Sequence, residues 1–358
     1  MALPSIAKYL DSEWKQKTLK INQRLTEFYR IFKKKSYPTA DDLFFTLEDL
    51  PYLGKEYWFL HFCAPPNEEQ VVLTLGRSVE PVKVNDTHVH LEQTAGSVPC
   101  AAVCWLYSGK KQVLFDSIAN VSIGSRSKNS GVRSLCAENK KSKMSISGNY
   151  PKYSIELVKD GKKIFTARAF PPKHGMPFEL VHLLKTPLIP RFGAAMINYY
   201  FDFTGTLYGK KLSGKAYLQK VVAVLPLAPW NWVRLHFKNG PALDFFAGKP
   251  LGTNSDMHFA CNDYVELSGR RVKLRDLKLS SYLSGEKTIW VLSGKNLHCT
   301  METYSLQPFI MKQKTTFRYD EYLVKVKSFA FRDGEREYTL SDFGEGVGLV
   351  EDASGYLL

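Results

Sequence analysis

The chain has 358 residues, a formal net charge of +14, 44% hydrophobic residues and 23% charged residues, which is typical of globular proteins with sizeable cores. The two longest apolar runs, 98–107 and 221–230, each hold about ten residues including proline, whereas a membrane-spanning helix needs about 20. These numbers exclude collagen-like, low-complexity and helical membrane-spanning proteins. The first residues do not show the positively charged segment and apolar stretch of a secretory signal, and the six cysteines are thinly spread. We therefore expect reduced thiols and a cytoplasmic location.

The first 52 residues are predicted to form a helical extension. Residues 12–35 repeat apolar side chains at helical spacing after Ser12, a good N-cap, and end in lysines that suit the helix dipole. Thr39 begins a capping-box-like pattern for a second, short helix that ends before Pro51. The basic first helix would either pack its apolar face on its own domain or lie on an anionic membrane surface.

After the extension, short runs of β-branched and aromatic residues alternate with turn residues. Asp160-Gly161, Asn239-Gly240 and Asp333-Gly334 are signals for hairpin turns. Strands do not alternate with helices, so we expect antiparallel barrels or sandwiches, with the proline-rich stretch 225–229 as a junction. The predicted units are a helical extension (1–52), a first β domain (53–225) and a second β domain (226–358).

The usual signatures of nucleotide-binding, metalloprotease and serine-hydrolase sites are missing from the sequence. His88 and His90 would share one face of a strand, but a third metal ligand is not visible nearby. Cys100 and Cys104 are not followed by a second close pair. We therefore expect neither a metal nor a cofactor. Nucleic acid is not an expected partner either, because the basic residues do not interleave with exposed aromatic residues.

The segment 230–237 combines large aromatic and polar residues on one face of a predicted strand. Trp230, Trp232, Arg234 and His236 alternate with apolar residues, so both faces of this strand need cover and the strand is expected to be central. Aromatic walls with a few polar groups are typical of a cavity for an apolar ligand. The alternative is a packed core with the two polar groups at its rim.

Several motifs occur in a familiar order along residues 55–358. They are Glu56-Tyr-Trp58-Phe-Leu-His61, Tyr199 to Leu207 followed by Ser213 to Gln219, Trp230-Asn-Trp232, and Gly346 to Tyr356. Together they resemble the lipocalin-like carotenoid 1,2-hydratase family. The resemblance implies a mainly β protein with two lipocalin-like antiparallel β-barrels in tandem, holding an elongated apolar ligand. The family's activities are hydration of isoprenoid double bonds and related cyclisations, and some members only associate with lipid.

The chain departs from this family where the family's proton-donating acid would stand, because Gln219 lies two residues after Tyr217. Hydration of an alkene begins with protonation of carbon, which needs a protonated acid in an apolar site and aromatic faces for the cation. The candidates for proton transfer are Tyr217, His236, Asp244 and Glu351. The candidates for substrate contact are Trp58, Gln219, Trp230, Trp232 and Arg234.

The leading hypothesis is a hydratase-type enzyme that adds water to, or protonates, a double bond of an isoprenoid chain such as a carotenoid or a prenyl-lipid precursor. One alternative is a non-catalytic lipid-binding protein of the same fold, and another is an isoprenoid or polyene cyclase or isomerase. All three predict a hydrophobic small molecule or lipid as the partner. A carboxyl group that faces the cavity within reach of the strand holding Trp230 and Trp232 would separate the hydratase from the lipid-binding protein.

Overall fold

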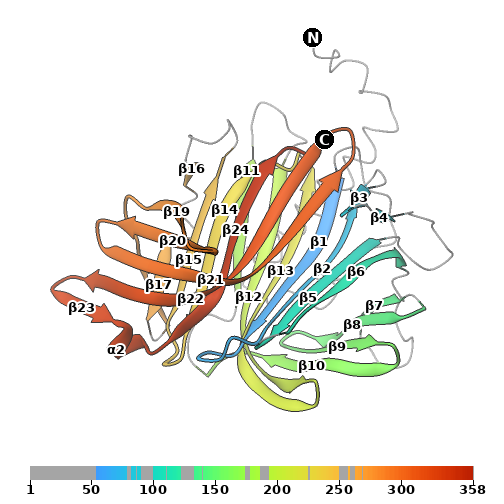
Figure 1. The fold of residues 1–358 in the computed structure, drawn as a ribbon, viewed down its shortest axis with the longest axis horizontal. Coiled ribbons are helices and arrows are strands. Elements are labelled where there is room, and N and C mark those ends of the chain that lie inside the picture. The colour runs from blue at the N-terminus through green and yellow to red at the C-terminus, as the bar shows by residue number, and fades with distance from the viewer. Residues whose placement is uncertain are drawn as a thin grey trace, which may run out of the picture.

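The computed structural model describes residues 54–78, 82–85, 87–89, 100–109, 111–121, 133–138, 140–173, 178–185, 193–224, 226–249, 257–258, 263–267 and 269–357. The helices predicted at 12–35 and after Thr39 lie outside these ranges, as does His90. In the described ranges nearly every residue with regular structure belongs to an antiparallel strand, and α2 (Leu340–Phe343) is a single short helical turn (Figure 1). No described helix has the length and apolar character needed to cross a membrane.

The strands form two large antiparallel sheets, which confirms the fold class predicted from the sequence. The first sheet runs in the order β6 (Lys111–Val121), β5 (Cys100–Ser108), β2 (Gln70–Ser78), β1 (Gly54–Cys63), β13 (Lys210–Val224), β12 (Gly193–Leu207), β10 (Lys162–Phe170), β9 (Lys152–Lys159), β8 (Ser142–Asn149) and β7 (Arg133–Glu138), with β11 (Phe178–Lys185) paired to β12. Its end strands β6 and β7 approach each other, so the sheet curls into a nearly closed barrel.

The second sheet is built from the C-terminal part of the chain. Its order is β18 (Arg270–Lys273), β17 (Tyr264–Leu267), β15 (Ala242–Gly248), β14 (Trp230–Phe237), β24 (Gly346–Gly355), β22 (Thr316–Asp333), β21 (Leu297–Lys312), β20 (Lys287–Gly294) and β19 (Lys278–Ser284), with β16 (Met257–His258) on β15 and β23 (Arg336–Thr339) on β22. The short strands β3 (Val82–Val84) and β4 (Thr87–Val89) leave the first part of the chain and join this sheet through β21.

The predicted hairpins are present at the glycine turns. Gly161, Gly240 and Gly334 have φ values of 74°, 105° and 63°, and they join β9 to β10, β14 to β15 and β22 to β23. A positive φ costs glycine little and other residues more, which is why these local signals could be read from the sequence.

Each sheet wraps around its own packed core. In the first sheet, alternate residues of β1 such as Trp58, Leu60 and Phe62 point inward, and the interior is filled by apolar side chains from the surrounding strands. The second sheet encloses a similar core around Val233, Leu235 and their neighbours. Both interiors are therefore occupied by side chains of the protein.

One end of the first interior carries charge. Glu56 accepts hydrogen bonds from Lys220 Nζ (2.5 Å) and from Arg77 Nη2 (2.7 Å), and all three side chains are buried. The two cations hold the pKa of the Glu56 carboxyl below its usual value, against the opposing effect of burial. The ammonium of Lys220 lies 6.0 Å from the ring centre of Trp58. Trp58 is fully buried and belongs to the core of the first sheet.

The two sheets pack against each other through their outer faces. A third apolar cluster lies between them and joins Phe59 and Tyr217 of the first sheet to Trp232 and Leu349 of the second. Strand β14 lies between β15 and β24 and is covered on both faces, as predicted for segment 230–237. Its polar face, however, looks toward the first sheet and not into a barrel, because the apolar positions Val233 and its neighbours already fill the interior.

Candidate functional site

The interface between the sheets holds a large group of buried polar side chains, together with aromatic rings from both sheets. Strands β1, β2, β5, β12 and β13 supply one wall, and β14, β15, β21, β22 and β24 supply the other. This arrangement follows from strand alternation, because the residues left over from the two interiors must face each other once the sheets stack. The interface is therefore the candidate functional site of the described chain.

Two carboxyl groups lie side by side at one end of this interface. Glu321 of β22 is directly opposite Glu351 of β24 in the strand register, and both residues are at most 3% exposed. The hydroxyl oxygen of Tyr319 lies 2.5 Å from Oε1 of Glu321 and 2.5 Å from Oε1 of Glu351. A phenol has one proton to donate, so a second short contact of this kind requires a proton on one of the carboxyl groups.

Two indole side chains, one from each sheet, donate hydrogen bonds to the carboxyl pair. Trp230 Nε1 of β14 donates to Glu351 Oε2 (2.7 Å), and Trp105 Nε1 of β5 donates to Glu321 Oε2. Burial raises the pKa of Glu321 to about 7, and burial together with the charge of Glu321 raises the pKa of Glu351 well above its ordinary value. The pair thus retains a proton near neutral pH.

A buried ion pair lies next along the interface. Arg234 Nη1 contacts Asp244 Oδ2, and Trp232 Nε1 donates to Asp244 Oδ1 (3.2 Å). The guanidinium contacts two neighbouring phenol rings, with its carbon 4.6 Å from the ring centre of Tyr200 and 4.5 Å from that of Tyr217. Asp244 therefore serves as the counterion of Arg234 here, which leaves it poorly suited to donate a proton.

Tyr217 and Gln219 form a small neutral network beside this ion pair. Tyr217 Oη donates to Asn198 Oδ1 (2.8 Å), and Gln219 Nε2 donates to Tyr217 Oη (2.8 Å) and to Asn198 Oδ1 (3.2 Å). Burial and the charge of Asp244 raise the pKa of Tyr217 well above its ordinary value. Gln219 thus orients the phenol of Tyr217 and supplies no acid.

A pair of neutral histidines occupies the other end of the interface. His61 Nε2 donates to Gln70 Oε1 (2.5 Å), and the rings of His61 and His236 are 6.4 Å apart. Neither ring nitrogen of His236 has a hydrogen-bond partner among the described residues. Burial lowers the pKa of His61 to about 4 and lowers that of His236 well below its ordinary value. Within the described chain, no group of three or more His, Cys, Asp or Glu side chains is placed to hold a metal ion.

The structure brings together eight of the nine candidates named from the sequence. They are Tyr217, Gln219, Trp230, Trp232, Arg234, His236, Asp244 and Glu351. Trp58 is the exception, because it points into the first interior. Sequence reasoning missed Glu321, Tyr319 and Trp105. Tyr319 and Glu321 share a strand face by their spacing of two, but only the fold pairs that face with Glu351.

Comparison with known proteins gives distant similarities only. No protein-family model and no curated protein matches the chain. Among solved structures, CghA with Sch210972 is 9% identical, with 85% of this chain and 89% of that chain covered and a TM-score of 0.46. A putative AttH from Nitrosomonas europaea is 13% identical (85% and 93% covered, TM-score 0.46), and kievitone hydratase from Nectria haematococca is 14% identical (89% and 94% covered, TM-score 0.38). At these values they establish neither family nor function.

Proposed function

We propose that the chain is a hydratase-type enzyme that protonates a carbon–carbon double bond of an apolar, isoprenoid-like substrate and adds water to the resulting cation. The observation that supports this proposal is the Glu321–Glu351 pair, which retains a proton in a buried site lined by indole and phenol rings. Such a pair supplies the acid that Gln219 lacks.

The chemistry uses atoms of the carboxyl pair and its partners. The carboxyl proton moves to one alkene carbon, and the other carbon becomes a tertiary cation that faces aromatic rings. The carboxylate left behind keeps the hydrogen bond from its indole, which is Trp230 for Glu351 and Trp105 for Glu321. Water then adds to the cation, and its surplus proton returns to the carboxylate, so the pair is restored.

The substrate would enter at the carboxyl end of the interface. Tyr57, Trp230 and Tyr319 are only half-buried, whereas Glu321 and Glu351 behind them are almost fully buried. The substrate must displace aromatic side chains to reach the acid, and this displacement also keeps bulk water out. A planar or rod-like hydrocarbon chain fits such an aromatic edge better than a charged molecule does.

The second candidate is the non-catalytic lipid-binding protein, which does not require a ligand to reach the enclosed carboxyl pair. Phe59, Tyr217 and Trp232 already contact one another, with ring centres 5.2–6.4 Å apart. In this case the carboxyl pair would serve only to join the sheets. A cyclase or isomerase shares the protonation step with the hydratase but not the addition of water.

Both candidates are tested by isotope incorporation. The purified protein is incubated with a panel of prenyl lipids and carotenoid precursors in heavy-oxygen, deuterated water, and products are analysed by mass spectrometry. We expect a product that carries both labels, and we expect E351Q and E321Q to abolish it. The control E302Q removes a carboxylate from an exposed ion pair with Lys287 (2.8 Å) and retains activity. Deuterium without heavy oxygen would indicate an isomerase or cyclase, and a bound but unlabelled lipid would contradict catalysis.

A further inference from the structure

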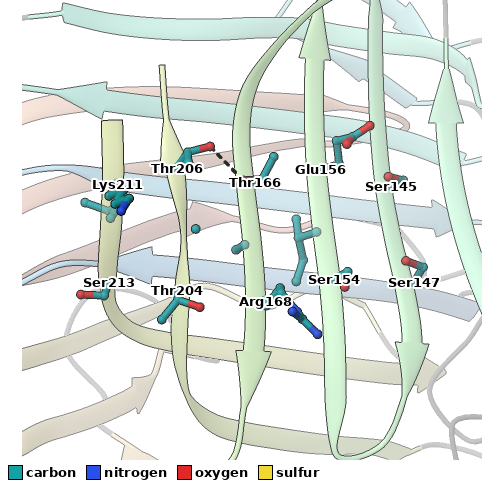
Figure 2. A pocket seen from close by; sticks show the side chains of 14 residues that line it. Ser145, Ser147, Ser154, Glu156, Thr166, Arg168, Thr204, Thr206, Lys211 and Ser213 are labelled. Carbon is teal, nitrogen blue, oxygen red and sulfur yellow. Dashed lines mark hydrogen bonds between the residues drawn. The ribbon is translucent and has the colours of Figure 1, made fainter. Parts of the chain in front are cut away.

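A second candidate site lies on the first sheet, on the outer face of β8, β9, β10, β12 and β13. It is a groove with a volume of about 790 Å³, within the range of small-molecule sites. Figure 2 shows its polar side chains projecting from neighbouring strands toward the same side of the sheet. None of its lining residues belongs to the sheet–sheet interface, so this groove is independent of the proposed function.

The strand register arranges the lining in two parallel rows that cross five strands. One row is Ser147, Ser154, Arg168, Thr204 and Ser213. The other row is Ser145, Glu156, Thr166, Thr206 and Lys211. Cross-strand neighbours in such rows are about 4.5–5.5 Å apart, so one small ligand can contact several of these side chains at once.

Hydroxyl groups dominate both rows, and aromatic side chains are missing from the lining. The only hydrogen bond drawn among the lining side chains joins Thr166 Oγ1 and Thr206 Oγ1, which are 2.9 Å apart (Figure 2). Each Ser or Thr hydroxyl can donate one hydrogen bond and accept others. The groove thus presents donors and acceptors in a pattern that complements a ligand rich in hydroxyl groups.

The charges of the groove are unequal. Its carboxylate, Glu156, is paired with Lys163 of the next strand at 2.6 Å. Arg168 and Lys211 are exposed, and neither is paired with a carboxylate within the described part of the chain. The groove therefore carries an excess of positive charge, and a guanidinium together with an ammonium is well suited to bind phosphate oxygens.

Gly205 allows β12 to lie close to β10 at the centre of the groove. A Cβ atom added to Gly205 would lie 1.8 Å from the carbonyl oxygen of Thr166, so another residue at this position would push β12 away from β10. The two rows stay continuous because the strands can approach this closely.

We propose that this groove binds a phosphorylated polyol, such as an inositol phosphate or a sugar phosphate. Arg168 and Lys211 contact the phosphate groups, and the hydroxyls of Thr204, Ser147 and their neighbours contact the polyol ring. The ligand can be a free metabolite or the headgroup of a phosphoinositide lipid, since both present the same chemistry.

Calorimetric titration of the full chain with inositol 1,4,5-trisphosphate tests the proposal, with inositol and inorganic phosphate as separate probes. We expect the trisphosphate to bind at least tenfold more tightly than either probe. The double variant R168A/K211A should lose at least tenfold in affinity, and the hydroxyl variant T204V should lose severalfold. The control R275A/K278A removes the same charges from exposed positions at and just before β19 and should bind as the original chain does.

Vesicles of phosphatidylcholine, with or without phosphatidylinositol 4,5-bisphosphate, separate the two sources of the ligand. Binding to the bisphosphate vesicles that R168A/K211A abolishes would identify the lipid headgroup, and trisphosphate binding without vesicle binding would identify the free metabolite. Inorganic phosphate binding as tightly as the trisphosphate, or equal losses in R168A/K211A and R275A/K278A, would overturn the proposal. Circular dichroism of each variant checks that the chain remains folded.

Discussion

At the scale of single residues, the carboxyl pair and the histidine pair make contributions to the stability of the fold that change in opposite directions with pH. Glu321 has an unfolded pKa near 4.5 and a folded pKa of about 7, so between these values the native chain holds a proton that the unfolded chain has released. Its contribution to stability therefore falls as pH rises through this window. His61 has a folded pKa of about 4 against 6.5 when unfolded, so its contribution rises with pH between these values.

The double variant E321Q/E351Q isolates the carboxyl effect. Glutamine cannot titrate, so the variant should gain stability relative to the original chain as pH rises from about 4.5 to about 7, by at most about 1.4 kcal/mol per pH unit for each carboxyl. Urea unfolding at a series of pH values measures this difference, and His61 is unchanged in both proteins. Parallel stability profiles would contradict the shared proton.

The Arg234–Asp244 pair offers a second test at this scale. Both side chains are about 1% exposed, so D244A leaves a guanidinium buried against Tyr200 and Tyr217 without its counterion. We expect the free energy of unfolding to fall by about 3–5 kcal/mol. The matched control is D333A, which breaks the exposed Arg270–Asp333 pair and should unfold close to the original chain in the same denaturant titration. Equal losses in both variants would contradict this reading.

At the scale of the elements, glycine positions decide which strands can approach each other. Gly348 of β24 lies opposite Leu235 of β14, and a Cβ there would meet the carbonyl oxygen of Arg234 at 2.0 Å. Strand β24 carries Glu351 three residues further on, and its Gly348 carbonyl accepts a hydrogen bond from Gln70 Nε2 (3.0 Å). Displacing this strand would therefore move the site as well as the core.

The pair of variants G348A and G76A tests this argument. G348A should lower the free energy of unfolding by about 1–3 kcal/mol or more, because the new methyl group meets backbone that cannot yield. In G76A the nearest atom is the Cβ of Tyr57 at 3.4 Å, an ordinary contact, so stability should stay equal or rise slightly. Thermal unfolding followed by circular dichroism compares the two, and a tolerated G348A would show that β24 is not closely fitted to β14.

The sequence predicted the strands and hairpins better than it predicted which strand faces come into contact. Alternation and glycine turns such as Asn239-Gly240 are local, so strands and hairpins could be read directly. Which face of segment 230–237 looks inward could not be read, because both faces are covered. The carboxyl site depends on Trp105 and Glu321, which are 216 residues apart and meet only when the two sheets stack. Glu351 was predicted as a candidate, but its partner Glu321 was not.

At the scale of the whole molecule, the two sheets share one interface and should act as one unit. Contacts cross it along its length: Trp105 reaches Glu321 at one end, Tyr264 Oη donates to Tyr200 Oη (3.2 Å) in the middle, and Gln70 reaches Gly348 at the other end. Buried polar groups at such an interface would lose their partners if the sheets separated, which makes partial opening unfavourable.

The variant F59A tests this coupling. Phe59 is 5% exposed and lies between the sheets, with its ring centre 5.6 Å from that of Trp232, so its truncation should cost about 3–5 kcal/mol. Because the sheets unfold together, native-state hydrogen exchange should show equal losses of protection in β5 of the first sheet and β20 of the second. If β5 loses protection while β20 keeps it, the sheets unfold separately, and the acid pair between them would then be free to open to solvent.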